Sequence, residues 1–157
     1  MSHERQGRAP SARELQAYLH DHIPLSRAME VSVVSIDVNG VLLRAPLAPN
    51  INHRETAFGG SMSALAILAA WSMLHARCRS EGIDSRLVIQ RNSMEYERPI
   101  QGDFTARART DEDEWNRFKR VFERKGKARI GVTSIIEYDG QTVGRFAGDF
   151  VALQVQP

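Results

Sequence analysis

The segment from residue 60 to about residue 78 leaves this chain few ways to fold. It is almost entirely apolar or small, and no aspartate or glutamate occurs from residue 59 to residue 80. The spacing predicts a helix that is hydrophobic on every side, and such a helix has to be buried on every side. Most of the remaining segments are strand-like, so we expect a sheet to wrap around this helix.

The strands of that sheet are predicted from runs of β-branched and alternating residues. These runs cover residues 86–98, 104–110, 128–138 and 142–155. Near the N-terminus, Asn39-Gly40 separates two further apolar runs and predicts a hairpin, whose second strand is expected to fray toward an edge at Pro46 and Pro49. Because the joints are short, neighbouring strands should be antiparallel. The expected class is α+β, a curved antiparallel sheet around one long central helix.

Two shorter helices complete the plan. Ser11 and Glu14 have the spacing of a capping box and predict a helix over residues 12–22, with Leu15, Tyr18 and Leu19 as its buried stripe. Aromatic residues at helical spacing predict a second, short helical insertion over residues 111–125. Its many basic residues are largely balanced by acidic ones, which favours a solvated face. The alternative is a contact with a cofactor phosphate or a carrier protein.

Composition excludes several classes of protein. The chain has 157 residues and a net charge of +2, too small to indicate nucleic-acid or membrane binding by bulk electrostatics. We expect residues 1–12 to be a disordered lead-in without signal-peptide character and residues 13–157 to form a single domain. The lone cysteine, Cys78, fits a reducing cytoplasm, and the histidines lack the spacing of metal ligands.

A polar loop leads into the central helix and ends in Gly59-Gly60. The glycines allow a ligand to approach the backbone, and the helix start supplies unpaired N–H groups and positive dipole character. This is a suitable place for a developing negative oxygen. A glycine-rich loop that only permits tight packing is the alternative.

Four segments resemble a known family. They are the Asn-x-x-x-Thr-x-Phe-Gly-Gly-Ser stretch at residues 52–61, and the segments at residues 94–103, 125–129 and 148–152. Together with the order of elements, they resemble the hotdog-fold superfamily, and the chain is most similar to the thioesterase domain of the YiiD C-terminal type over about residues 13–155. The resemblance implies hydrolysis of an acyl chain carried by coenzyme A or acyl carrier protein. It also implies a homodimer, or a dimer of dimers, with active sites between subunits.

The chain departs from related thioesterases at two positions. Many of them have an Asn followed six residues later by His-Gly-Gly, and an acid further along the central helix. Here Asn52, Gly59 and Gly60 match, but Phe58 replaces the histidine and Ile67 lies about where the acid is expected. The usual activation of water by an acid on the central helix is therefore not available.

We expect the loop to supply the missing chemistry. Backbone N–H groups of Gly60 and Ser61 would stabilise the oxyanion, and Glu55 would act as the base. Asn52 would orient the water or the carbonyl, and Thr56 or Ser61 would complete the hydrogen bonding. The alternatives are that Glu55 is a surface carboxylate paired with its neighbours and that Asn52, like Asn50, only forms a turn.

Other residues are candidates for holding the substrate. The substrate-binding candidates are Asn50, Phe58, Gly59, Met62, Tyr96 and Arg98. No metal and no cofactor is expected apart from the coenzyme A portion of the substrate. The second hypothesis is a non-catalytic acyl-CoA-binding sensor, since loss of the helix acid is what loss of catalysis would look like. A third, a hotdog hydratase, requires His53 and Glu55 both to face inward.

Overall fold

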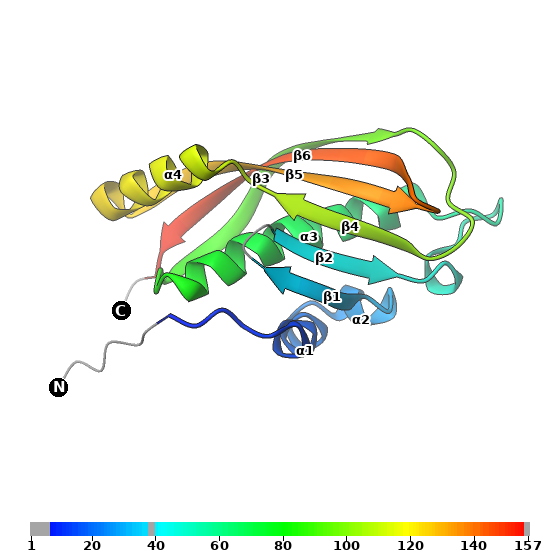
Figure 1. The fold of residues 1–157 in the computed structure, drawn as a ribbon, viewed down its shortest axis with the longest axis horizontal. Helices are drawn as coiled ribbons and strands as arrows, with labels where there is room; N and C mark the ends of the chain where they lie inside the picture. Colours follow the sequence, from blue (N-terminus) through cyan, green and yellow to red (C-terminus); the bar gives the residue numbers. More distant parts are fainter. Residues whose placement is uncertain (1–6, 38–39, 156–157) are drawn as a thin grey trace.

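The computed structural model describes residues 7–37 and 40–155, which form one antiparallel sheet and several helices. The sheet order is β1-β2-β4-β5-β6-β3. Figure 1 shows the sheet curving along one side of α3, with α1 and α2 beside β1, and with α4 beyond the end of β4 and alongside the first part of β5. The elements are α1 (Ala12–His22), α2 (Pro24–Ala28), β1 (Ser32–Asp37), β2 (Gly40–Ala45), a 3₁₀ turn (Ala48–Asn50), α3 (Gly59–Ser80), β3 (Ser85–Tyr96), β4 (Phe104–Arg109), α4 (Glu112–Lys125), β5 (Lys127–Tyr138) and β6 (Gln141–Gln154).

Helix α1 begins with the predicted capping box. The backbone N–H of Glu14 donates to Ser11 Oγ (3.1 Å), and the Ser11 N–H donates to Glu14 Oε1 (3.4 Å). Leu15 and Leu19 are buried, but the prediction for Tyr18 was wrong, because its side chain is 37% exposed. The Tyr18 ring stacks on the outside of α3 instead.

The N-terminal hairpin is present, but its second strand does not lie at an edge. β2 pairs with β1 on one side and with β4 on the other, so the edge prediction was wrong. Pro46 follows the last residue of β2 and ends the strand rather than exposing it. The predicted turn residue Asn39 lies outside the described residues, as do residues 1–6 of the predicted lead-in.

The core lies between α3 and the inner face of the sheet. Alternate residues of β5 and β6 point toward the helix, including Ile130, Ile136, Phe146 and Phe150. Ser134 is the polar exception on this face, and its hydroxyl donates to the carbonyl oxygen of Ala66 in α3 (2.9 Å). The helix is therefore held to the sheet by apolar packing and by one buried hydrogen bond at mid-length.

The insertion α4 has the predicted extent and docks through its aromatic residues. Trp115 and Phe118 are buried, and the indole N–H of Trp115 donates to Glu81 at the end of α3 (2.6 Å). Glu114 accepts a hydrogen bond from the backbone N–H of Gly131 (2.9 Å), at the part of β5 that lies beyond its pairing with β4. The acidic and basic residues of α4 thus serve contacts within the chain and a solvated face.

Candidate functional site

The loop before α3 is a tight turn closed by its own hydrogen bonds. Ile51 and Ala57 form an isolated bridge, and the backbone N–H of Asn52 donates to the carbonyl of Thr56 (2.8 Å). The Asn52 side chain is fully engaged: Oδ1 accepts from the backbone N–H groups of Arg54 (2.8 Å) and Thr56 (3.1 Å), and Nδ2 donates to Thr56 Oγ1 (2.9 Å). These are the bonds of a residue that forms a turn.

Asn50 anchors the start of this loop to the body of the protein. Its side chain is buried, and Nδ2 donates to the carbonyl oxygens of Met29 (3.0 Å) and Pro46 (2.7 Å). Its own carbonyl accepts from the N–H of Phe58 (2.7 Å), the residue that precedes α3. Asn50 therefore fixes where α3 begins, while its buried Oδ1 atom has no hydrogen-bond partner among the described residues.

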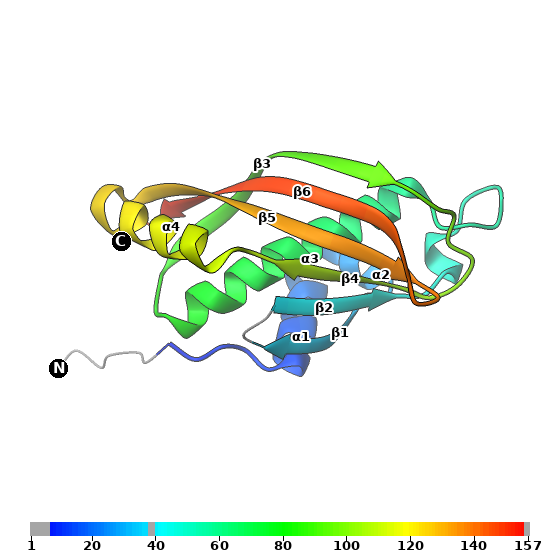
Figure 2. The ribbon, with the colours of Figure 1, turned by 45° about the horizontal axis from the view of Figure 1, so that its top comes forward.

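Glu55 lies at the outer part of the loop. Its backbone φ is 63°, its side chain is exposed, and the described residues place neither Arg54 nor His53 in an ion pair with it. In Figures 1 and 2 the loop projects beyond the sheet at the end of the molecule where α3 begins. Over residues 7–37 and 40–155 of one chain, no ion pair orients its carboxylate.

The first turn of α3 offers two unpaired backbone donors. Phe58 is the N-cap and gives no side-chain hydrogen bond to the helix start. The N–H groups of Ser61 (2.9 Å) and Met62 (3.1 Å) both donate to the Phe58 carbonyl, so the Ser61 amide named above is occupied. Among the described residues, the N–H groups of Gly59 and Gly60 have no hydrogen-bond partner.

Two aromatic rings lie over these glycines. A Cβ atom at Gly59 would be 3.3 Å from Cε1 of Tyr96, and one at Gly60 would collide with the ring of Phe58. Both rings are more than half exposed, Phe58 at 57% and Tyr96 at 55%. Each of the two glycines therefore has one largely exposed aromatic ring beside it.

The remaining candidates lie close by but differ in burial. Met62 is buried under the first turn of α3, whereas the exposed Arg98 follows β3 and donates to Gln141 Oε1 (2.5 Å) at the start of β6. Sequence reasoning missed Met94 and Gly144, which meet Met62 between α3 and the sheet. A glycine within a strand pattern was the one available signal for that close approach.

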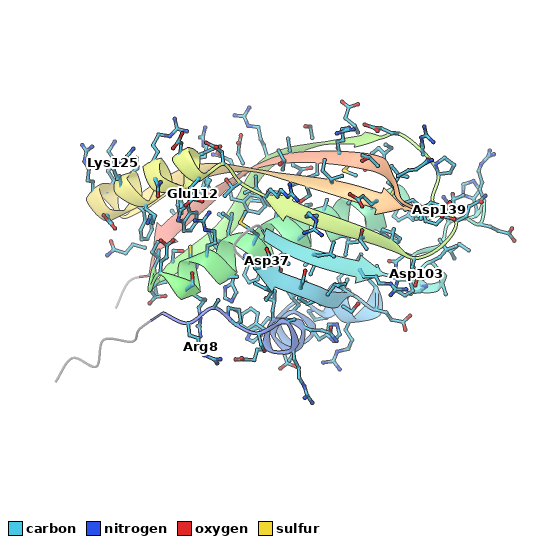
Figure 3. All side chains as sticks on the ribbon, viewed as in Figure 1. Arg8, Asp37, Asp103, Glu112, Lys125 and Asp139 are labelled. Atoms are coloured by element: carbon cyan, nitrogen blue, oxygen red, sulfur yellow. The ribbon has the colours of Figure 1, made fainter. Side chains whose placement is uncertain are left out.

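The larger cavities lie away from this site. One of about 950 Å³ is lined by Ile36, Val41, Met73 and Arg77 among others, and its rim carries Asp37 and Glu112. Figure 3 places Asp37 and Glu112 on the half of the molecule away from the end marked by Asp103 and Asp139, where α3 begins. Another of about 600 Å³ lies on the outer face of the sheet beside α4. Neither is lined by a residue predicted for the site.

Near the site, one side of α3 is only partly covered. The expectation that α3 is buried all round was wrong for a stripe that contains Ala64 and Ile67, which are only partly buried. Trp71, further along the same stripe, is also partly buried, but the Tyr18 ring of α1 stacks on it. Within the described residues, β3 lies at the edge of the sheet and pairs with β6 alone. Val88 and Ile89 on this strand are 41% and 36% exposed. An apolar helix face and an unpaired strand edge thus adjoin the free amides.

Two side chains on α3 have strongly shifted pKa values. Burial, with a smaller contribution from Arg79, lowers the pKa of His75 to about 4. Burial raises the pKa of the Cys78 thiol to about 11, which leaves it protonated and unsuited to act as a nucleophile. In the part of the chain that the structure describes, no group of three or more His, Cys, Asp or Glu side chains could hold a metal ion. No helix there is long and apolar enough to cross a bilayer.

Comparison with known proteins places the chain in a family. The model of the family described as "Putative thioesterase (yiiD_Cterm)" matches residues 12–154. A protein of unknown function from Chlorobaculum tepidum TLS is 34% identical, with a TM-score of 0.87 over 92% of this chain and 94% of that one. A "putative thioesterase" from Shewanella oneidensis is 24% identical and shares the fold, with a TM-score of 0.79 over 90% and 96% of the two chains. The chain belongs to this thioesterase family of the YiiD C-terminal type, and its fold is the hotdog fold.

Proposed function

We propose that the chain hydrolyses acyl thioesters of coenzyme A or acyl carrier protein, with the reacting carbonyl at the first turn of α3. The observation that carries this proposal is the pair of unpartnered N–H groups of Gly59 and Gly60, two glycines that lie beside the rings of Tyr96 and Phe58. Attack on a thioester places negative charge on the carbonyl oxygen. Two fixed amide donors at the positive end of a helix dipole stabilise that charge.

Glu55 is the proposed base. Activation of water by a carboxylate contributes roughly 100- to 10,000-fold to a hydrolysis rate, and α3 itself carries no acid. Asn52 contributes by shaping the turn that carries Glu55, and Thr56 completes that turn through its hydroxyl. The Gly60 amide then acts together with that of Gly59, since the Ser61 amide is bonded to Phe58.

A second copy of the chain completes the proposed site. The exposed stripe of α3 and the free edge of β3 need a cover, and an unpaired strand of this length is a ready template for pairing. A partner seated there encloses the acyl group between Phe58 and Tyr96 and orients Glu55. The protein is then a cytoplasmic homodimer, a location that the single buried cysteine favours.

The test removes the N–H group of Gly59 and compares the result with a substitution that keeps it. Gly59 is the first residue of α3, where proline is well tolerated, and Phe58 has the extended ψ of 133° that proline requires of its predecessor. Gly59→Pro lacks the donor, while the control Gly59→Ala keeps the donor and adds a Cβ beside Tyr96. With a panel of acyl-CoAs and a thiol-reactive dye, Gly59→Pro should be at least about 100-fold slower in kcat than Gly59→Ala.

Two outcomes count against the proposal. Equal rates for both folded variants would remove Gly59 from the oxyanion site. Acyl-CoA binding without thiol release at any chain length would favour the non-catalytic sensor instead. That alternative has two observations in its favour: α3 has no acid, and the Asn52 side chain is engaged within its own turn.

A further inference from the structure

Two methionine side chains meet beside Gly144, and one of them comes from the first turn of α3, which carries the two free amides. Gly144 of β6 is buried, and a Cβ atom there would lie 2.8 Å from Cε of Met94 and 3.2 Å from Cε of Met62. Both terminal methyl groups therefore occupy the position that any larger residue at 144 would need. The backbone carbonyl of Glu95 bounds the same spot at 3.3 Å.

These methionines reach Gly144 from the two elements that carry the site. Met62 lies in the first turn of α3, three residues after Gly59. Met94 lies on β3 two residues before Tyr96, so it shares the inner face of the sheet with the ring that covers Gly59. β3 and β6 pair here through Met94 with Phe146 and Tyr96 with Gly144. An acyl chain that enters between Phe58 and Tyr96 meets the two methyl groups next.

Methionine is suited to give way at such a position. It is unbranched, and rotation about its side-chain bonds moves the terminal methyl group without a shift of the backbone. The Met62 side chain is buried, with 4% of its surface exposed, whereas the Met94 side chain is only partly buried. The larger cavities lie elsewhere, so an acyl chain can extend inward only as far as these side chains retreat.

We propose that Met62, Met94 and Gly144 form a compressible end wall of the acyl site and restrict the protein to short acyl chains. This inference depends on the proposed function, because it assumes that the acyl group begins at Gly59 and Gly60. Removal of a methionine end deepens the pocket. The substitution Gly144→Ala adds a methyl group that pushes the ends of the Met62 and Met94 side chains toward the amides of Gly59 and Gly60. The pocket then becomes shallower.

The experiment separates binding from hydrolysis. Non-hydrolysable thioether analogues of acyl-CoA, from acetyl to palmitoyl, are titrated into the wild-type protein, Met62→Ala, Met94→Ala and Gly144→Ala. The control Met73→Ala truncates a buried methionine in the second half of α3, which lines the distant cavity of about 950 Å³. It has a similar cost in packing but leaves the end wall intact.

The expected result is a shift in the preferred chain length. Met94→Ala and Met62→Ala should bind longer analogues at least about tenfold more tightly than the wild type does, since one or two extra methylenes in an apolar pocket have an effect of that size. Gly144→Ala should shift the preference toward shorter chains, and Met73→Ala should leave it unchanged. Thiol release from the corresponding substrates is measured separately.

Each failure has its own signature. If folded Met62→Ala and Met94→Ala keep the chain-length preference of the wild type, the proposal of an end wall is overturned. This holds whether or not the protein hydrolyses thioesters. Shifted binding without hydrolysis in any variant supports the end wall and overturns only the catalytic part of the proposed function. Absence of binding to every analogue overturns both.

Discussion

Glu55 carries the largest share of the proposed chemistry and has few contacts in the single chain. Replacement of this carboxylate by an amide keeps the size of the side chain and removes the base. We expect Glu55→Gln to lower kcat for acyl-CoA hydrolysis at least about tenfold. Binding of a non-hydrolysable analogue should be unchanged, because the carboxylate is not placed among the groups that hold the acyl chain.

The chain provides a matched control for this substitution. Glu30 is also an exposed glutamate in the left-handed region, with φ of 57° against 63° for Glu55. Glu30→Gln should leave kcat and the melting temperature unchanged. If Glu55→Gln behaves like Glu30→Gln, the base is another group and Glu55 is a surface residue.

The sequence predicted candidate site residues but could not separate their roles. A polar side chain or a backbone amide can bind a substrate, or it can form hydrogen bonds within its own loop. The sequence pattern is the same in both cases, as it is for Asn50, Asn52 and Ser61. The hydrogen bonds decide: Asn50 anchors the loop, Asn52 shapes the turn, and the Ser61 amide is bonded to Phe58. Gly59 was predicted as a substrate contact, and its free amide becomes visible only from the bonding of the first turn.

Helices α1 and α3 meet through a stack of rings that includes a histidine with an altered pKa. The His75 ring lies 4.7 Å from the Trp71 ring and 5.0 Å from the Tyr18 ring, and Tyr18 also stacks on His22 at 4.0 Å. Burial, with Arg79 adding to it, lowers the pKa of His75 to about 4 from an ordinary 6.5. Between these two values the unfolded chain binds a proton that the folded chain does not.

Stability should therefore fall as the pH falls from about 7 toward 4. For one proton, the free energy of unfolding changes by at most about 1.4 kcal/mol per pH unit. Because the His75 ring is partly exposed, we expect the free energy of unfolding to fall by only about 1 kcal/mol between pH 7 and pH 5. Urea unfolding at several pH values measures it. His75→Phe keeps a ring in the stack and should flatten this dependence, while His53→Gln, on the exposed loop, should not. An unchanged slope in His75→Phe contradicts the assignment.

Helices and strands with local signals were predicted correctly, and errors arose where burial depends on distant elements. The capping box of α1 and the aromatic spacing of α4 are encoded within a few residues. The position of β2 between two strands and the exposure of Tyr18 depend on which elements pack beside them. The apolar character of α3 predicted burial on every side, but the sheet of this chain covers the helix only in part.

The single chain leaves apolar surface partly open along the α3 stripe with Ala64 and Ile67 and along the inner face of the edge strand β3. On β3, Ile89 is paired with the buried Phe150 and faces α3, whereas its neighbour Val88 faces the outer side of the sheet. A second copy that covers α3 and extends the sheet along β3 buries Ile89 but leaves Val88 at an outer surface.

We therefore expect Ile89→Lys to dissociate the protein and Val88→Lys to leave it dimeric. A buried lysine without a partner is costly, whereas an outer-face lysine remains hydrated. Sedimentation at micromolar concentrations measures the oligomeric state of the two variants. Because a partner closes the proposed acyl site, the rate of thiol release should fall in Ile89→Lys and should not fall in Val88→Lys. A wild-type protein that is monomeric at these concentrations and fully active would show that one chain suffices, and the second copy would then have no part in the site.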